Sequence, residues 1–291
     1  MRNIDEDNIT QAVIARHATA GDARAREVMT SLVQHLHAFA REVHLTEAEW
    51  ADGIGFLTEC GRLCDDRRQE LMLLSDTLGL SMLVTAQNQR KPRGCTEATG
   101  LGRFHVDGAP PTAQGDDLGR GAQGEPCFVR GQVRALDGTP IAGAEVQVWH
   151  ADGDGLYDTQ HDGAPSLRAR GVLCSDANGS FQFRTVVAGP RAIPHDGPVG
   201  RMLTLLGRHP WRPAHLHFMI TATGYQRLVT HVFRQGDAYL DSDAVFGVRS
   251  SLVADWVHHP PGPTPDGQAS AVPFTTLDFA FVLNATTGDK T

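Results

Sequence analysis

The hydrophobic pattern of this chain changes its period near residue 126, which limits the fold to a helical part followed by a strand-rich part. From residue 9 to about residue 89, apolar residues recur at helical spacing. We expect helices over residues 9–17, 23–43 and 67–89, and another opened by Thr46 with Glu49 as its capping-box partner. Residues 90–125 are rich in glycine and proline and are expected to form a connecting loop.

After Pro126 the pattern becomes one of short alternating segments separated by glycine turns. This alternation predicts strands over residues 128–135, 144–150, 179–185, 215–221 and 228–234. Regularly spaced short strands of this kind are typical of a β-sandwich. We therefore predict an α+β protein with a helical domain over residues 1–100 and a β-sandwich domain over residues 101–291.

Composition excludes some classes of function. The 291 residues carry a formal net charge of −8 and no basic block, so nucleic acid is not an expected partner. No apolar run of about 18 residues occurs, and the chain opens with polar and acidic residues. We expect a soluble, cytoplasmic protein that does not bind membranes.

A histidine pair in the segment Arg212-Pro213-Ala214-His215-Leu216-His217-Phe218 points to a metal site. Residues two apart on a strand share a face, so both imidazoles would point one way while Leu216 and Phe218 fill the apolar face. Neutral imidazole is the commonest metal ligand. The same spacing also occurs as plain surface alternation, so the pair by itself leaves both interpretations open.

The tripeptide His35-Leu36-His37 provides an internal comparison. Its surroundings have helical spacing, which places the two imidazoles about 200° apart around a helix axis. They could not chelate one ion, and we interpret them as ordinary helix histidines.

A series of segments, spread along the chain in a fixed order, forms a recognisable pattern: 29–33, 45–47, Leu73-Leu74-Ser75-Asp76-Thr77-Leu78-Gly79, 108–110, Asp154-Gly155-Leu156-Tyr157-Asp158, 206–209, 212–218 and Tyr239-Leu240-Asp241-Ser242-Asp243-Ala244-Val245-Phe246-Gly247. Together these segments resemble the intradiol ring-cleavage dioxygenases, and the first hundred residues are most similar to the hydroxyquinol 1,2-dioxygenase branch.

The resemblance implies one non-haem Fe(III) per subunit, held in the family by two tyrosines and two histidines. It places one tyrosine at Tyr157 and the histidines at His215 and His217, whereas the position of the second tyrosine is occupied by Arg191. A guanidinium keeps its proton at any working pH, so it cannot ligate iron. The other tyrosines, Tyr225 and Tyr239, match family positions that are not ligands.

Further site residues follow from the same resemblance. Arg212 matches an arginine near the reacting ring, and the alternative is a packing arginine paired with a carboxylate. His231 is expected to hydrogen-bond beside the site rather than to ligate the metal. His195 could fill the coordination position that the missing second tyrosine leaves open on the metal, although an exposed loop histidine is the simpler interpretation.

Leu101, Arg103 and Asp76 are expected to contribute to substrate binding. Arg103 stands where the family usually has proline, and it is either a solvated loop residue or part of a cationic pocket. Together with Arg191 it would favour a substrate that carries an anionic group.

The resemblance implies an enzyme that cleaves hydroxyquinol or a catechol between its two hydroxylated carbons with O₂. The alternative is a diverged relative with lost or altered ring cleavage, acting on an anionic substituted diol or as a binding protein. The family also implies a homodimer formed through the helical region, with a possible bound phospholipid at the interface.

Overall fold

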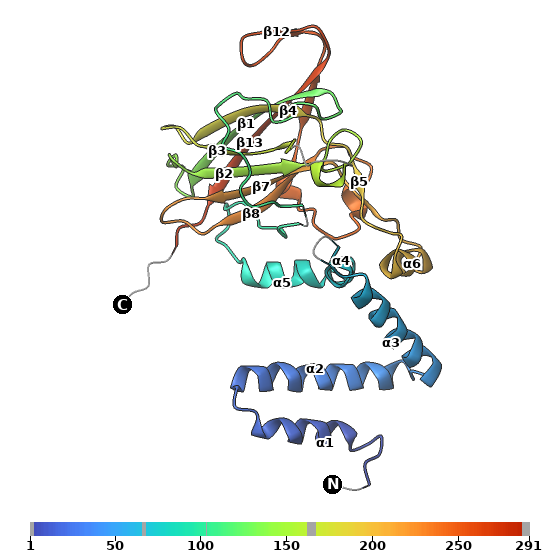
Figure 1. The fold of residues 1–291 in the computed structure, drawn as a ribbon. Coiled ribbons are helices and arrows are strands. Elements are labelled where there is room, and N and C mark those ends of the chain that lie inside the picture. Colours follow the sequence, from blue (N-terminus) through green and yellow to red (C-terminus); the bar gives the residue numbers. More distant parts are fainter. Residues whose placement is uncertain (1–2, 66–67, 103, 162–166, 287–291) are drawn as a thin grey trace. The chain divides into compact units, whose positions relative to one another are not determined.

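The computed structural model describes residues 3–65, 68–102, 104–161 and 167–286. It divides into two compact units, Met1–Arg62 and Leu63–Thr291 (Figure 1). The helices between residues 63 and 100 belong to the second unit. The functional domain boundary near residue 100 stays a prediction. No helix in the described part of the chain is long and apolar enough to cross a membrane.

The first unit is helical, as predicted. It contains α1 (Ile9–Arg16), the 3₁₀ turn η1 (His17–Thr19), α2 (Ala23–Glu42) and α3 (Glu47–Arg62). The capping box before α3 is confirmed, since the Thr46 amide donates to Glu49 (2.9 Å) and the Glu49 amide donates to Thr46 (3.3 Å). On α2 the two histidines have separate partners: His35 bonds the carbonyl of Ser31 and His37 bonds the hydroxyl of Thr10. Their interpretation as ordinary helix residues is therefore supported.

The single helix predicted over residues 67–89 is wrong, because this segment forms two helices, α4 (Glu70–Thr77) and α5 (Leu80–Asn88). Gly79 between them has a φ of +76°, in the left-handed region that interrupts a right-handed helix. Apolar spacing continues across this break, which is why the hydrophobic pattern alone did not reveal it.

Two stacked sheets form the body of the second unit (Figure 1). The four-stranded sheet has the order β10-β13-β1-β4 and the five-stranded sheet has the order β3-β2-β7-β8-β9. A further ribbon pairs β5 with β6, and β11 pairs with β12. The bounds of the strands are β1 Pro126–Ala135, β2 Glu145–His150, β3 Arg170–Cys174, β4 Ser180–Val186, β5 Arg191–Ala192, β6 Trp211–Arg212, β7 His215–Thr221, β8 Leu228–Arg234, β9 Val253–Ala254, β10 Trp256–His259, β11 Gly262–Pro263, β12 Ala269–Ser270 and β13 Phe274–Leu283. Helix α6 spans Pro198–Leu205.

The central strand β7 determines where the site lies. It is buried on both faces. Leu216, Phe218 and Ile220 join the apolar core between the sheets, so alternation turns His215 and His217 to the other face. This confirms the strand and the orientation of its side chains predicted from the sequence.

Candidate metal centre

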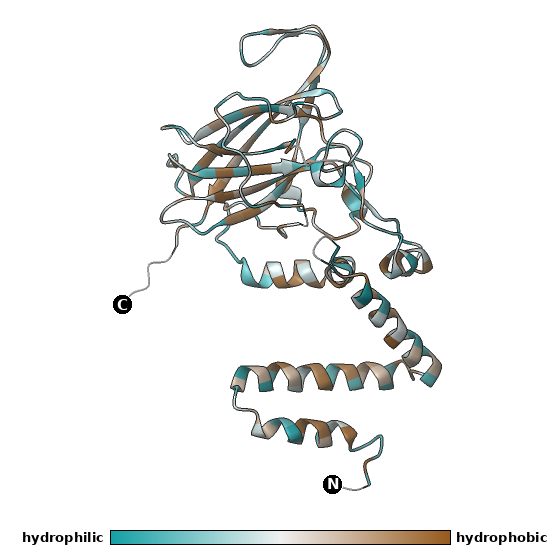
Figure 2. Cartoon of the chain, in the orientation of Figure 1, coloured by the Kyte–Doolittle hydropathy of each residue, from teal (hydrophilic) through white to brown (hydrophobic). Residues whose placement is uncertain are grey.

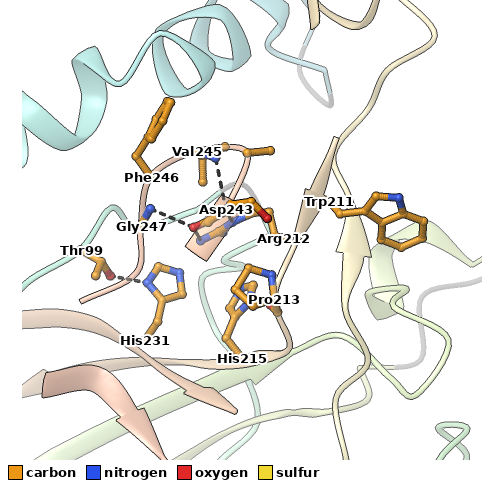
Figure 3. Close-up of polar contacts among 12 residues, drawn as sticks. Thr99, Trp211, Arg212, Pro213, His215, His231, Asp243, Val245, Phe246 and Gly247 are labelled. Carbon is orange, nitrogen blue, oxygen red and sulfur yellow. Dashed lines mark hydrogen bonds and ion pairs between the residues drawn. The ribbon is translucent and has the colours of Figure 1, made fainter. Parts of the chain in front are cut away.

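Strands β7 and β8 bring three buried histidines together on one face of the sheet. Figure 3 shows two of them, His215 and His231. His217 lies directly opposite His231 in the strand register. One ligand atom from each of His215, His217 and His231 lies within 4.8 Å of the others. All three side chains are at most 3% exposed.

Tyr157 reaches the same point from the loop after β2. Its hydroxyl oxygen lies 2.7 Å from Nε2 of His217, and that nitrogen lies 3.2 Å from Nε2 of His215. Two nitrogens that each lie about 2.1 Å from one ion, at 90–109°, would be roughly 3.0–3.4 Å apart. The spacing of these donors therefore fits a single metal ion.

Contacts outside the cluster orient two of the imidazoles. Nδ1 of His215 bonds the carbonyl of Pro213 at 2.7 Å, and Nδ1 of His231 bonds Oγ1 of Thr99 (Figure 3). With the proton on Nδ1 in both rings, each Nε2 keeps a free lone pair, which is the usual arrangement of a metal-binding histidine. His217 is held differently, since its ring stacks on Trp149 with centroids 4.8 Å apart.

Burial lowers the pKa values of His215, His217 and His231 well below 6.5, and the neighbouring positive charge of Arg212 lowers them further. The imidazoles are thus neutral at pH 7, which is the form that binds metals.

Arg212 lies beside these histidines in a buried ion pair with Asp243. The Nε–Oδ1 and Nη2–Oδ2 distances are 3.0 and 3.3 Å. Asp243 also accepts backbone hydrogen bonds from Gly247 (2.8 Å) and Val245 (3.3 Å), as Figure 3 shows. Burial works to raise the pKa of Asp243, but Arg212 outweighs it and the pKa is lowered. The carboxylate partner considered for Arg212 from the sequence is therefore present, and the pair fixes a guanidinium next to the cluster.

Arg191 lies opposite Arg212 in the β5–β6 ribbon. Its guanidinium carbon is 4.6 Å from the ring centre of Phe104 and 5.1 Å from that of Tyr157. The side chain is buried, and within residues 3–65, 68–102, 104–161 and 167–286 it forms no ion pair and its Nε has no hydrogen-bond partner. Burial lowers its pKa from the usual arginine value. Where the family's second tyrosine is expected, this chain thus holds a buried cation against the tyrosine that remains.

Two of the three residues predicted to bind substrate, Leu101 and Asp76, lie within the described part of the structure. Leu101 is 43% exposed. The adjacent Gly102 passes so close to the cluster that an added Cβ would lie 2.8 Å from Cε1 of His217. Asp76 on α4 is half-buried, and its charge helps to raise the pKa of Arg212. Arg103 lies outside the described residues.

The remaining candidates for a vacant ligand position lie elsewhere. His195 is exposed, and its Nδ1 bonds the carbonyl of Ile193 at 3.1 Å. Tyr225 pairs with Ala285 in an isolated antiparallel β-bridge, and the ring of Tyr239 stacks on that of Trp211. In the described part of the chain, none of them joins the cluster.

Sequence reasoning missed three supporting residues. Asp243 was part of a family-like segment without an assigned role, and a buried arginine nearby was the signal that it needed a carboxylate partner. Thr99 and Trp149 contact His231 and His217 only through tertiary structure, so nothing in the local sequence identified them.

Comparisons with known proteins agree with this architecture. Residues 22–96 match the family model described as "Catechol dioxygenase N terminus", and residues 108–285 match the model described as "Dioxygenase". The 6-chlorohydroxyquinol 1,2-dioxygenase of Cupriavidus pinatubonensis is 59% identical over 98% of this chain and 100% of its own length. The hydroxyquinol 1,2-dioxygenase of Nocardioides simplex is 48% identical over 96% of this chain and 95% of its own length.

Solved structures show the same relationship. The crystal structure of hydroxyquinol 1,2-dioxygenase from Pseudomonas putida has a TM-score of 0.91 and 43% identity, covering 96% of this chain and 98% of that one. Catechol 1,2-dioxygenase from Pseudomonas arvilla has a TM-score of 0.83 and 28% identity, covering 98% and 92%. Members of this family use non-haem iron, and the buried tyrosine and histidines supply donors that suit iron. The chain belongs to the intradiol ring-cleavage dioxygenases.

Proposed function

We propose that this protein cleaves the ring of hydroxyquinol or a substituted hydroxyquinol with O₂, using one iron ion per subunit held by Tyr157, His215 and His217. The observation that carries the proposal is the buried cluster of these three donors, with spacings of 2.7 and 3.2 Å, beside a guanidinium fixed by Asp243. The relatives named for hydroxyquinol and chlorohydroxyquinol support the choice of substrate.

Each group has a distinct task in this reaction. Iron, when bound, would hold both oxygens of the diol and make the ring reactive toward O₂, whose two atoms both enter the product. Arg212 would stabilise negative charge on the bound diol, because a preorganised cation in a buried site acts strongly on developing charge. Arg191, at the position of the family's second tyrosine, keeps its proton and cannot accept one from the incoming diol. We therefore expect ring cleavage to be slower than in an enzyme with that tyrosine.

The cation at position 191 also bears on substrate choice. Arg191 is buried with an unpaired Nε, and Arg103 precedes Phe104, whose ring lies beneath the Arg191 guanidinium. A charge-assisted hydrogen bond from either arginine would be worth about 1.5–3 kcal/mol. That is enough to change substrate preference by roughly tenfold or more. We propose a preference for diols with an anionic substituent or an extra hydroxyl over unsubstituted catechol.

Oxygen uptake by the iron-loaded protein tests both points. Hydroxyquinol, a carboxylated catechol and catechol should be consumed in falling order, with one O₂ per ring, and His215→Ala should consume none of them. In Arg103→Pro, the preference over catechol should narrow. If the iron-loaded protein consumed oxygen with none of these diols, the alternative of a diverged binding protein would replace this proposal, and Arg191 is the observation that favours it.

We also propose that the first unit mediates a homodimer. Helices α2 and α3 carry brown segments along their length in Figure 2. Large apolar side chains are exposed on these helices and at the end of α2: Val28, Met29, Leu32, Leu36, Phe39, Val43, Trp50, Ile54 and Leu57. A monomer rarely leaves so many large apolar groups in water. Light scattering after size-exclusion chromatography should give twice the chain mass, and Leu36→Glu should lower it. A phospholipid in this interface, as in the family, would appear in the mass spectrum of an organic extract.

A further inference from the structure

We infer that His231 is a metal ligand in this chain, so that three histidines and one tyrosine form the centre. The inference rests on the metal centre of the proposed function but does not require ring cleavage.

The first step is the need for another donor. Arg191 stands at the position of the second tyrosine and cannot coordinate a cation. Of the histidines, cysteines and acidic residues that the structure describes, one group of three has ligand atoms close together, and it consists of His215, His217 and His231. His231 is therefore the further histidine that the cluster offers as a donor.

The second step is the position of His231 on the sheet. It lies directly across from His217 on the neighbouring strand, so both side chains emerge on the same face. The ring centres of His231 and His217 are 4.2 Å apart, and those of His231 and His215 are 4.9 Å apart. Their ligand atoms all lie within 4.8 Å of one another, so the three rings converge on one point.

The third step is the orientation of the ring. Nδ1 of His231 is engaged by the hydroxyl of the buried Thr99. Nε2 is fully buried, with no hydrogen-bond partner among the described residues. A buried polar atom without a partner is unfavourable, and a metal ion at the centre of the cluster would supply that partner. An outer hydrogen bond on one ring nitrogen with the other left for the metal is the usual arrangement of a histidine ligand.

The fourth step concerns the charge of the bound ion. Tyr157 would be the sole anionic donor of the four, and the buried Arg191 places its guanidinium carbon 5.1 Å from the Tyr157 ring centre. Arg212, paired with Asp243, is a second buried cation beside the histidines. Phenolate oxygens favour ferric over ferrous iron, whereas imidazoles suit divalent iron, copper and zinc. The centre should therefore favour divalent ions more than a two-tyrosine centre does.

X-ray absorption of the purified protein, loaded without oxygen with Fe(II) or Zn(II), tests the ligand set directly. Three imidazole ligands in the wild-type protein support the inference, and two overturn it. In His231→Gln the count should fall from three to two.

Chelator competition with Zn(II) provides a second measurement. Thr99→Val should weaken Zn(II) binding by about 10–100-fold, as loss of an outer hydrogen bond typically does, and His231→Gln should weaken it further. The matched control is His150→Gln, another buried histidine of the five-stranded sheet whose ring nitrogens bond Ala151 and Thr185. Its Zn(II) affinity should stay close to that of the wild type, because both ring nitrogens of His150 are already bonded to groups outside the cluster. If it weakened Zn(II) binding as much as His231→Gln does, the effect would come from loosening of the sheet and the inference would fall.

The two proposals fail separately. Three imidazoles on the metal without oxygen uptake would remove the proposed ring cleavage and support the inference. Ring cleavage with two imidazoles on the metal would support the proposed function and overturn the inference.

Discussion

The buried ion pair between Arg212 and Asp243 makes Asp243→Asn an informative substitution for both stability and activity. The side chains of the pair are 9% and 2% exposed, and both carboxylate oxygens contact the guanidinium. Asparagine keeps the size of the side chain but removes the charge that offsets the buried guanidinium. Breaking a buried pair by removing one partner typically costs about 3–5 kcal/mol, and we expect a loss of this size in the free energy of unfolding.

An exposed pair with the same geometry provides the control. Arg130 contacts Asp278 through Nε–Oδ1 at 2.8 Å and Nη2–Oδ2 at 2.9 Å, with side chains 54% and 60% exposed. Water screens this pair, so Asp278→Asn should cost only about 0–1 kcal/mol. The two substitutions differ in burial, while the chemistry of the change is the same.

Urea unfolding followed by tryptophan fluorescence measures both losses, because the buried Trp149 and Trp256 report on the sandwich. The turnover number with hydroxyquinol should also fall in Asp243→Asn, since Arg212 is released from its position beside the histidines, whereas Asp278→Asn should leave it unchanged. A stability loss in Asp243→Asn no greater than that in Asp278→Asn would refute the reasoning.

Three further predictions concern the metal centre and its protonation. Alanine at both His215 and His217 should remove the metal while circular dichroism shows the fold retained, and full iron occupancy in this double variant would contradict the assignment. Arg191→Tyr should deepen the visible ferric charge-transfer absorption and slow iron loss, because it replaces a buried cation 5.1 Å from the ring centre of Tyr157 with a second phenolate donor. An unchanged spectrum and metal content in Arg191→Tyr would contradict the placement of residue 191 at the metal centre. The control is Arg191→Leu, which removes the charge without adding a phenolate and should slow iron loss without deepening the absorption band. In the metal-free protein, burial holds the pKa of His150 at about 4 and those of the three clustered histidines well below 6.5. The unfolded chain therefore binds more protons as the pH falls through 6.5, and stability present above that pH should be lost by up to about 1.4 kcal/mol per pH unit for each histidine. Urea midpoints between pH 7 and 5 should show this slope, His150→Gln should make it shallower, and midpoints independent of pH would argue against buried neutral histidines.

The strand that carries the site could be predicted from the sequence because its periodicity has one consistent interpretation. Alternation placed Leu216 and Phe218 in the core and His215 and His217 on the opposite face, and the structure confirms this. The capping box at Thr46 could also be predicted, since the interaction is local in sequence.

Contacts between distant segments could not be predicted in this way. Thr99 reaches His231 across 132 positions of sequence, and Asp243 reaches Arg212 across 31. No periodicity relates such positions. The break at Gly79 is a different kind of miss, because the apolar spacing continues through a glycine whose positive φ interrupts the helix.

Strand pairing explains why Arg191 can change the centre without disturbing the sheets that build it. His215 and His217 lie on the central strand of the five-stranded sheet, where each has cross-strand neighbours on at least one side. Arg191 lies on the two-residue strand β5, which pairs with β6 outside the two large sheets. A substitution at position 191 therefore alters the charge and the number of phenolates at the centre, while the registers that bring the histidines together remain.

The proposed metal centre would couple metal binding to folding through the three clustered histidines. An ion that binds the folded chain alone stabilises it by about 2.7 kcal/mol at a free concentration 100 times its dissociation constant. Since this stabilisation follows the logarithm of the affinity, a substitution at position 191 that changes metal affinity tenfold should change the stability of the loaded protein by about 1.4 kcal/mol. The same substitutions should leave the stability of the metal-free sandwich nearly constant, apart from the cost of burying the side chain at position 191 itself.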